Sequence, residues 1–157
     1  MLRLELEGDV LQLTEPVFEA WPRPRWRPTI DVTLDVTASQ VRLLAAVETE
    51  GEDSWFDQLL LTAPGALDER ENFLRRVGSV DELDSGWLLG TLRDPEALTA
   101  ADNLEPVEIA RLVARHRTLL QALALPRGWV AIVIGDTIRE VFDASGKELL
   151  ASRFGAD

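Results

Sequence analysis

Apolar and charged residues alternate at both ends of the chain, which is the pattern of strands that bury one face. Residues 2–7 (LRLELE) and 10–18 (VLQLTEPVF) flank a Gly-Asp turn and predict an N-terminal hairpin. Residues 128–134 (GWVAIVI) and 137–143 (TIREVFD) flank a second Gly-Asp turn and predict a C-terminal hairpin. We therefore expect β-structure at both ends.

The pattern is less decisive in between. Residues 29–36 (TIDVTLDV) alternate again and predict a strand. Residues 41–49 (VRLLAAVET) fit a strand or a helix, and we favour a strand paired with the preceding one. Residues 54–62 (SWFDQLLLT) are equally ambiguous, whereas residues 86–92 (GWLLGTL) predict a short buried strand.

Two segments have helical spacing. Residues 66–77 (ALDERENFLRRV) end at Gly78, a residue that commonly terminates helices. The stronger prediction is a helix over 106–124, with Pro106 in its first turn and Pro126 beyond its end. One face of this helix would carry an apolar stripe of Ile109, Leu112, Val113, Leu120 and Leu123, which also includes His116.

These elements predict an α+β fold, with a mostly antiparallel sheet, hairpins at both ends and two main helices packed against it. The length of 157 residues suits a single domain over 1–157. Within it we also consider a β-rich part, 1–65, and an α+β part, 66–157.

Residues 21–28 (WPRPRWRP) place three arginines and three prolines between and around two tryptophans. Prolines lack a backbone donor, so the segment is expected to be extended rather than helical. It could bind anions or act as a proline-rich ligand. We favour a crossover that Trp21 and Trp26 hold on the sheet while the arginines pair with nearby acids.

The net charge of −12 comes from the middle of the chain, since residues 43–108 hold 16 acidic residues and four arginines. Phosphate binding needs basic surface, so nucleic acid is excluded as a main partner. An acidic surface suits a basic protein partner, because opposite potentials speed and orient association. The alternative is a solvated surface that only aids solubility.

The residues for common catalytic or metal sites are missing or isolated. There is no cysteine, and the single histidine, His116, lies in the apolar stripe with no nucleophile motif to pair with. No glycine stands in a phosphate-binding motif. We therefore expect no catalytic residue, no metal and no cofactor. No segment is apolar for long enough to cross a membrane, and we expect a cytoplasmic protein.

Two acidic runs each end in a tryptophan: EGEDSW at 50–55 and DELDSGW at 81–87. Tryptophan is enriched in interface hot spots, and surrounding charge can steer a partner. The alternative is a polar turn entering a buried strand, so Trp55 and Trp87 could each be core or interface. The predicted partner-binding residues are Glu52, Asp53, Trp55, Asp57, Asp81, Glu82, Asp84, Ser85, Trp87, Asp94, Glu96 and Asp102.

Residues 80–133 resemble a family of small bacterial immunity proteins of toxin–immunity systems. The resemblance rests on the acidic turn before Ser85-Gly86-Trp87, on Gly90, and on Asp102-Asn103. It continues through the apolar segment that ends in LALPRGWVAIV, where the family has a Leu-x-x-Pro-x-Gly-aromatic ending.

The resemblance implies a protein that binds and neutralises one cognate toxin stoichiometrically, without a cofactor. Two other functions stay open. One is an adaptor or assembly subunit that binds a protein without inhibiting it, and the other is a carboxylate-dependent enzyme. The sequence leaves the oligomeric state and the chemistry of the toxin open.

Overall fold

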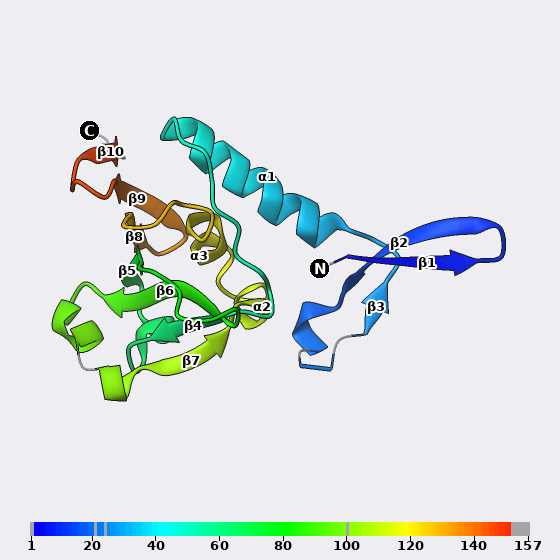
Figure 1. Cartoon of the computed structure of the whole chain (residues 1–157), viewed down its shortest axis with the longest axis horizontal. Helices are drawn as coiled ribbons and strands as arrows, with labels where there is room; N and C mark the ends of the chain where they lie inside the picture. The colour runs from blue at the N-terminus through cyan, green and yellow to red at the C-terminus, as the bar shows by residue number, and fades with distance from the viewer. Residues whose placement is uncertain (1, 21, 24, 100, 152–157) are drawn as a thin grey trace.

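The structure is a computed structural model, and it describes residues 2–20, 22–23, 25–99 and 101–151. These residues form two β-sheets and three α-helices (Figure 1). The strands are β1 (Arg3–Glu7), β2 (Val10–Pro16), β3 (Trp26–Arg27), β4 (Leu59–Thr62), β5 (Glu71–Arg76), β6 (Asp84–Thr91), β7 (Glu105–Glu108), β8 (Val130–Ile134), β9 (Thr137–Phe142) and β10 (Glu148–Ala151). The helices are α1 (Asp31–Ala46), α2 (Ile109–Leu112) and α3 (Arg117–Ala122), with short 3₁₀ turns at Phe18–Ala20, Ala66–Asp68, Pro95–Thr99 and Ala101–Asn103.

The larger sheet has seven strands in the order β10-β9-β8-β5-β6-β4-β7. All its neighbouring strands are antiparallel except β4 and β6, which are parallel. Helix α3 packs against β8 and β9, and α1 packs against α3. The smaller sheet, β1-β2-β3, extends away from this body (Figure 1). The predicted α+β class, both hairpins and the strand near 86–92 are confirmed.

The strands predicted at 29–36 and 41–49 are wrong, because both segments lie in α1. The buried side chains Val36, Leu43 and Val47 follow helical spacing, whereas Leu34 points to solvent. In residues 29–36, polar residues stand between apolar ones over a length of about two helical turns. Over so short a window, a helix and a strand can show the same alternation, and the pattern does not distinguish them. Of the ambiguous segment 54–62, only its last four residues form a strand, β4.

The beginning of α1 is held by a residue from another element. The backbone N–H groups of Val32 and Thr33 donate to the Glu15 carboxylate, at 3.2 and 2.8 Å, and the Thr33 hydroxyl donates at 2.8 Å. Arg27 pairs with the same carboxylate at 2.6 Å. Burial disfavours ionisation of Glu15, but these hydrogen bonds outweigh it and hold its pKa below the ordinary value. Glu15 thus joins the smaller sheet to the body.

The helix predicted over 66–77 is also wrong. A single 3₁₀ turn at Ala66–Asp68 is followed by β5, the central strand between β8 and β6. Its buried face carries Asn72, Leu74 and Arg76, so two of the three inward side chains are polar. The alternation of buried and exposed residues along β5 therefore does not appear as an alternation of apolar and polar residues in the sequence.

The long helix predicted over 106–124 is replaced by β7, α2 and α3. Its apolar stripe is nevertheless core, since Ile109, Leu112, Leu120 and Leu123 are all buried. Pro106 lies in β7, at the edge of the sheet, opposite Leu61. An edge strand tolerates proline because one side of it needs no ladder hydrogen bonds.

Within the segment 21–28, Trp26–Arg27 form the short strand β3, which pairs with the end of β2. The Arg3 guanidinium lies 5.6 Å from the centre of the Trp26 ring, and Arg27 pairs with Glu15. Of the predicted pairing of the arginines with nearby acids, the structure shows that of Arg27. Trp21 lies outside the described residues.

Candidate functional site

The two acidic runs that end in tryptophan meet where β4 and β6 begin. These strands run parallel, and their first residues, Leu59 and Asp84, are paired. The Leu59 N–H donates to the Leu83 carbonyl at 2.7 Å, and the Gln58 amide donates to the Glu82 carbonyl at 3.2 Å. Segments 52–58 and 81–84 therefore form one continuous surface.

This surface contains a groove, which we name the Trp55 groove. It has a volume of about 690 Å³. Its lining residues are Leu2, Trp55, Phe56, Asp57, Gln58, Glu82 and Leu83. Trp55 is 61% exposed, although a tryptophan side chain is on average highly buried. The Trp55 backbone N–H donates to the Gln58 side chain at 2.9 Å, which fixes the loop that carries the ring.

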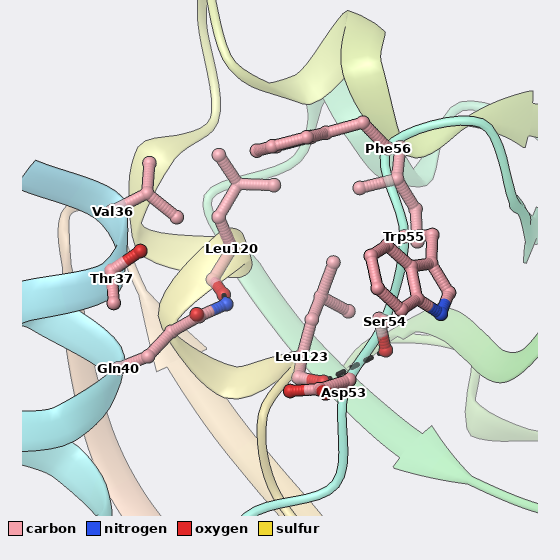
Figure 2. Close-up of a pocket in the computed structure, with 10 residues that line it drawn as sticks. Val36, Thr37, Gln40, Asp53, Ser54, Trp55, Phe56, Leu120 and Leu123 are labelled. Carbon is pink, nitrogen blue, oxygen red and sulfur yellow. Dashed lines mark hydrogen bonds between the residues drawn. The ribbon is translucent and has the colours of Figure 1, made fainter. Parts of the chain in front are cut away.

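A smaller pocket of about 240 Å³ lies on the other side of Trp55. Figure 2 shows Val36, Thr37 and Gln40 of α1 facing the loop that carries Asp53 and Trp55. The Ser54 hydroxyl donates to the Leu123 carbonyl at 2.9 Å, which ties this loop to the end of α3. Trp55 and Phe56 line both cavities, so the indole ring forms the ridge between them.

The acidic side chains around Trp55 fall into two groups. The carboxylates of Asp81 and Asp84 accept backbone N–H groups within their own turn. Glu52 pairs with Arg76 and Arg127, at 3.6 and 3.4 Å. These three carboxylates have structural roles.

In contrast, the carboxylates of Asp53, Asp57 and Glu82 make no hydrogen bond or ion pair with any described residue. Asp53 and Asp57 are exposed on either side of Trp55, and Glu82 is exposed across the Trp55 groove. Asp53 still interacts electrostatically with Arg76, whereas no such interaction with a described residue is seen for Asp57 and Glu82. An exposed ring beside negative charge suits a partner that presents Lys or Arg next to an apolar side chain.

Arg76 positions this loop, a role that the sequence pattern did not indicate. Its guanidinium donates to the carbonyls of Glu52, Asp53 and Leu125, at 3.0, 3.1 and 2.9 Å. It also lies 5.6 Å from the centre of the Trp87 ring. Burial lowers the pKa of Arg76, an effect that Glu52 opposes, yet a guanidinium stays charged at neutral pH. Because the predicted helix placed Arg76 at a solvated terminus, its role could be found only in the structure.

The structure places Trp87 in the core rather than on the surface. Its side chain has no exposed area, and its indole N–H donates to the Leu123 carbonyl at 3.2 Å. Ser85 is buried as well and donates to the Leu59 carbonyl at 2.7 Å. Gly86 adopts a φ of +73°, and a Cβ there would lie 2.5 Å from the Val77 carbonyl oxygen. All three residues therefore have structural roles where β4, β5 and β6 lie side by side.

The remaining predicted residues, Asp94, Glu96 and Asp102, lie beyond the other end of β6. They are exposed. A strand of this length spans roughly 25 Å, so they do not share a surface with the Trp55 groove. Asp94 instead lines a separate hollow with Pro64, Ala97 and Asn103. The twelve predicted residues are thus divided between two ends of the sheet and the core.

Within the described ranges, no group of three or more His, Asp or Glu side chains could hold a metal ion. His116 directly precedes α3, and its pKa is lowered by burial and by Arg115. No helix among the described residues is long and apolar enough to cross a membrane.

The comparison with protein families identifies the chain. Residues 39–144, about two-thirds of its length, match the model of the Imm33-like domain, so the chain belongs to the Imm33-like family. This is a family of immunity proteins, and the chain is therefore a toxin-immunity protein with a cognate toxin as its partner. Membership also suggests that it is not an enzyme. No curated protein and no solved structure gave a significant match.

Proposed function

We propose that this protein neutralises its cognate toxin by stoichiometric binding through the Trp55 groove, so that the bound protein covers a basic functional surface of the toxin. The observation that carries the proposal is the exposed Trp55 ring between the unpaired carboxylates of Asp53, Asp57 and Glu82. No cofactor takes part. Of the predicted partner-binding residues, the proposal keeps those around the Trp55 groove and leaves out Asp94, Glu96 and Asp102 at the other end of β6.

Two physical effects would act together in this interface. The unpaired carboxylates attract a basic toxin before contact and raise the association rate. Trp55 then supplies a large apolar area that the partner can desolvate, which is the usual basis of an interface hot spot. Family membership supports a toxin as the partner, and the charge of −12 supports a basic one.

The test begins with the toxin. Affinity capture with the tagged protein at low salt, followed by mass spectrometry, should recover one stoichiometric partner that is toxic when expressed alone. Binding of that purified partner is then measured by surface plasmon resonance at several salt concentrations. Trp55→Ala should weaken the affinity about 30-fold or more, mainly through faster dissociation.

The double variant Asp57→Lys and Glu82→Lys should slow association and flatten its salt dependence. The matched control is Asp94→Lys with Glu96→Lys, which makes the same charge change at the other end of β6 and should leave both rates nearly unchanged. If the control pair weakens binding and the groove pair does not, the interface lies at the other end. Recovery of a multi-subunit complex without a toxic member would instead support the adaptor.

A further inference from the structure

The N-terminal hairpin has one face that, toward its turn, is made of leucine. In β1 and β2, Leu4 is paired with Leu13 and Leu6 with Leu11, so all four side chains lie on the same face. Leu2, the residue before β1, continues the alternation. The other face carries Arg3, Glu5, Glu7, Val10, Gln12 and Thr14. The hairpin therefore separates apolar from mainly polar residues, as a sheet does when one face is buried.

The described residues leave much of this face exposed. The five leucines are between 37% and 72% exposed, with the largest values near the hairpin turn. Figure 1 shows the hairpin extending beyond the body of the molecule, and it also lies outside the matched family segment 39–144. We name the face formed by Leu2, Leu4, Leu6, Leu11 and Leu13 the leucine face. The Trp55 groove does not account for it, since only Leu2 reaches that groove.

We propose that the leucine face binds the leucine face of a second copy of this chain, so that the protein forms a symmetric dimer through its hairpins. A twofold interface brings the same patch together on both copies, and a face that is apolar throughout is complementary to itself. A partner selected by acidic charge has no counterpart among the five leucines, because the next side chain on the same side of β2, Glu15, is buried and paired with Arg27. The acidic residues of β1, Glu5 and Glu7, point away from it.

The area is sufficient for such a dimer. The combined exposure of the five leucines equals nearly three fully exposed leucine side chains, on the order of 500 Å² per copy. A pair would bury about 1,000 Å² in total, which is close to the lower limit of specific interfaces. Two packed sheets also match each other in shape at the usual separation of about 10 Å. We therefore expect a dissociation constant on the order of 10 µM rather than an obligate dimer.

Salt should distinguish this contact from toxin binding. Each copy carries a net charge of −12, so two copies repel each other at long range. Added salt screens that repulsion and strengthens apolar contacts, and the dimer should become tighter. The contact between the Trp55 groove and a basic toxin should respond in the opposite direction.

Sedimentation equilibrium of the full chain tests the proposal directly. The average mass should rise from 17.5 kDa at about 1 µM toward twice that value at about 200 µM. Leu6→Lys combined with Leu11→Lys should raise the dissociation constant about 100-fold, because two lysines would be buried against leucine. Both leucines are exposed in the single chain, so the substitutions remove no core contact, and circular dichroism checks that the two opposed lysines leave the hairpin folded.

The matched control is Val41→Lys combined with Val80→Lys, two exposed apolar residues outside the hairpin. It makes the same charge change and should leave the dissociation constant unchanged. A wild-type chain that stays at 17.5 kDa throughout overturns the proposal, even if the leucine face then proves to contact the toxin. A dimer that the Leu6 and Leu11 substitutions leave intact, or that weakens with salt, overturns it as well.

The absence of native cysteine allows an independent measurement. Single cysteines placed by Leu4→Cys, Leu6→Cys, Leu11→Cys and Leu13→Cys should yield a disulfide-linked dimer under mild oxidation for at least one position. Val80→Cys, the matched exposed control, should stay monomeric under the same conditions. Cross-linking at Val80 but at none of the four leucines would contradict the proposed face.

Discussion

Replacement of Arg76 by lysine is the most informative single perturbation of this protein. The guanidinium holds three backbone carbonyls from two different segments: Glu52 and Asp53 before the Trp55 loop, and Leu125 after α3. Lysine keeps the charge but has one nitrogen, which cannot reach all three carbonyls in this fixed arrangement. The change therefore tests geometry rather than charge.

The magnitude follows from the contacts that are lost. A hydrogen bond from a charged donor contributes about 1.5–3 kcal/mol, and an unsatisfied buried carbonyl costs about 1–3 kcal/mol. The Arg76 side chain is only 6% exposed, so water cannot fully replace the missing donors. Loss of at least one or two of the three bonds, together with weaker packing on Trp87, leads us to expect about 3–4 kcal/mol of destabilisation.

Urea denaturation followed by tryptophan fluorescence measures this free energy. For a chain of about 150 residues, the expected loss corresponds to a fall in melting temperature of roughly 6–16 °C. Arg75→Lys is the matched control, because Arg75 is the preceding residue of β5 and is exposed on the opposite face. It should change stability by less than about 0.5 kcal/mol.

The affinity for the toxin should also fall in the part of the sample that remains folded, because the Trp55 loop loses its anchor. If Arg76→Lys is as stable as Arg75→Lys, the three hydrogen bonds of Arg76 do not contribute the expected 3–4 kcal/mol, about the sum of one or two lost charged hydrogen bonds. If stability falls but affinity does not, Arg76 does not position the loop.

Three further predictions concern the fold. Trp87→Ala should cost about 3–5 kcal/mol in urea denaturation, whereas Trp55→Ala should cost less than about 1 kcal/mol, because only Trp87 is core; equal losses would contradict this assignment. Gly86→Ala should cost at least about 2 kcal/mol, and the control Gly65→Ala, which has the same φ of +73° but free space at Cβ, should cost about 1 kcal/mol. Glu15→Gln should destabilise the protein by roughly 1.5–3 kcal/mol at neutral pH. Because the folded pKa of Glu15 is lowered, its contribution to stability is present above the unfolded pKa of about 4.3 and is lost as the pH falls through the folded pKa. The stabilities of the wild type and the variant should therefore converge in acid. A constant difference in stability down to low pH would contradict this role of Glu15.

The candidate site was only partly predictable. The acidic runs before Trp55 and Trp87 are visible as local composition, and the parallel pairing of β4 with β6 then brings them together. The two tryptophans have the same local setting, yet one is exposed and the other is core. Neighbouring residues alone cannot distinguish them, because burial depends on what α3 and β5 place over each ring.

The sequence by itself determined the strands of the two terminal hairpins, which alternation indicated, and β6, which a short apolar run indicated. It also determined the overall negative charge and the burial of the apolar stripe predicted within 106–124. The tertiary structure alone decided the helix α1, which Glu15 caps from the smaller sheet, and the strand β5, whose buried face carries Asn72 and Arg76. In both cases the stabilising partner lies far away in the chain, so the local hydrophobic period carries no record of it.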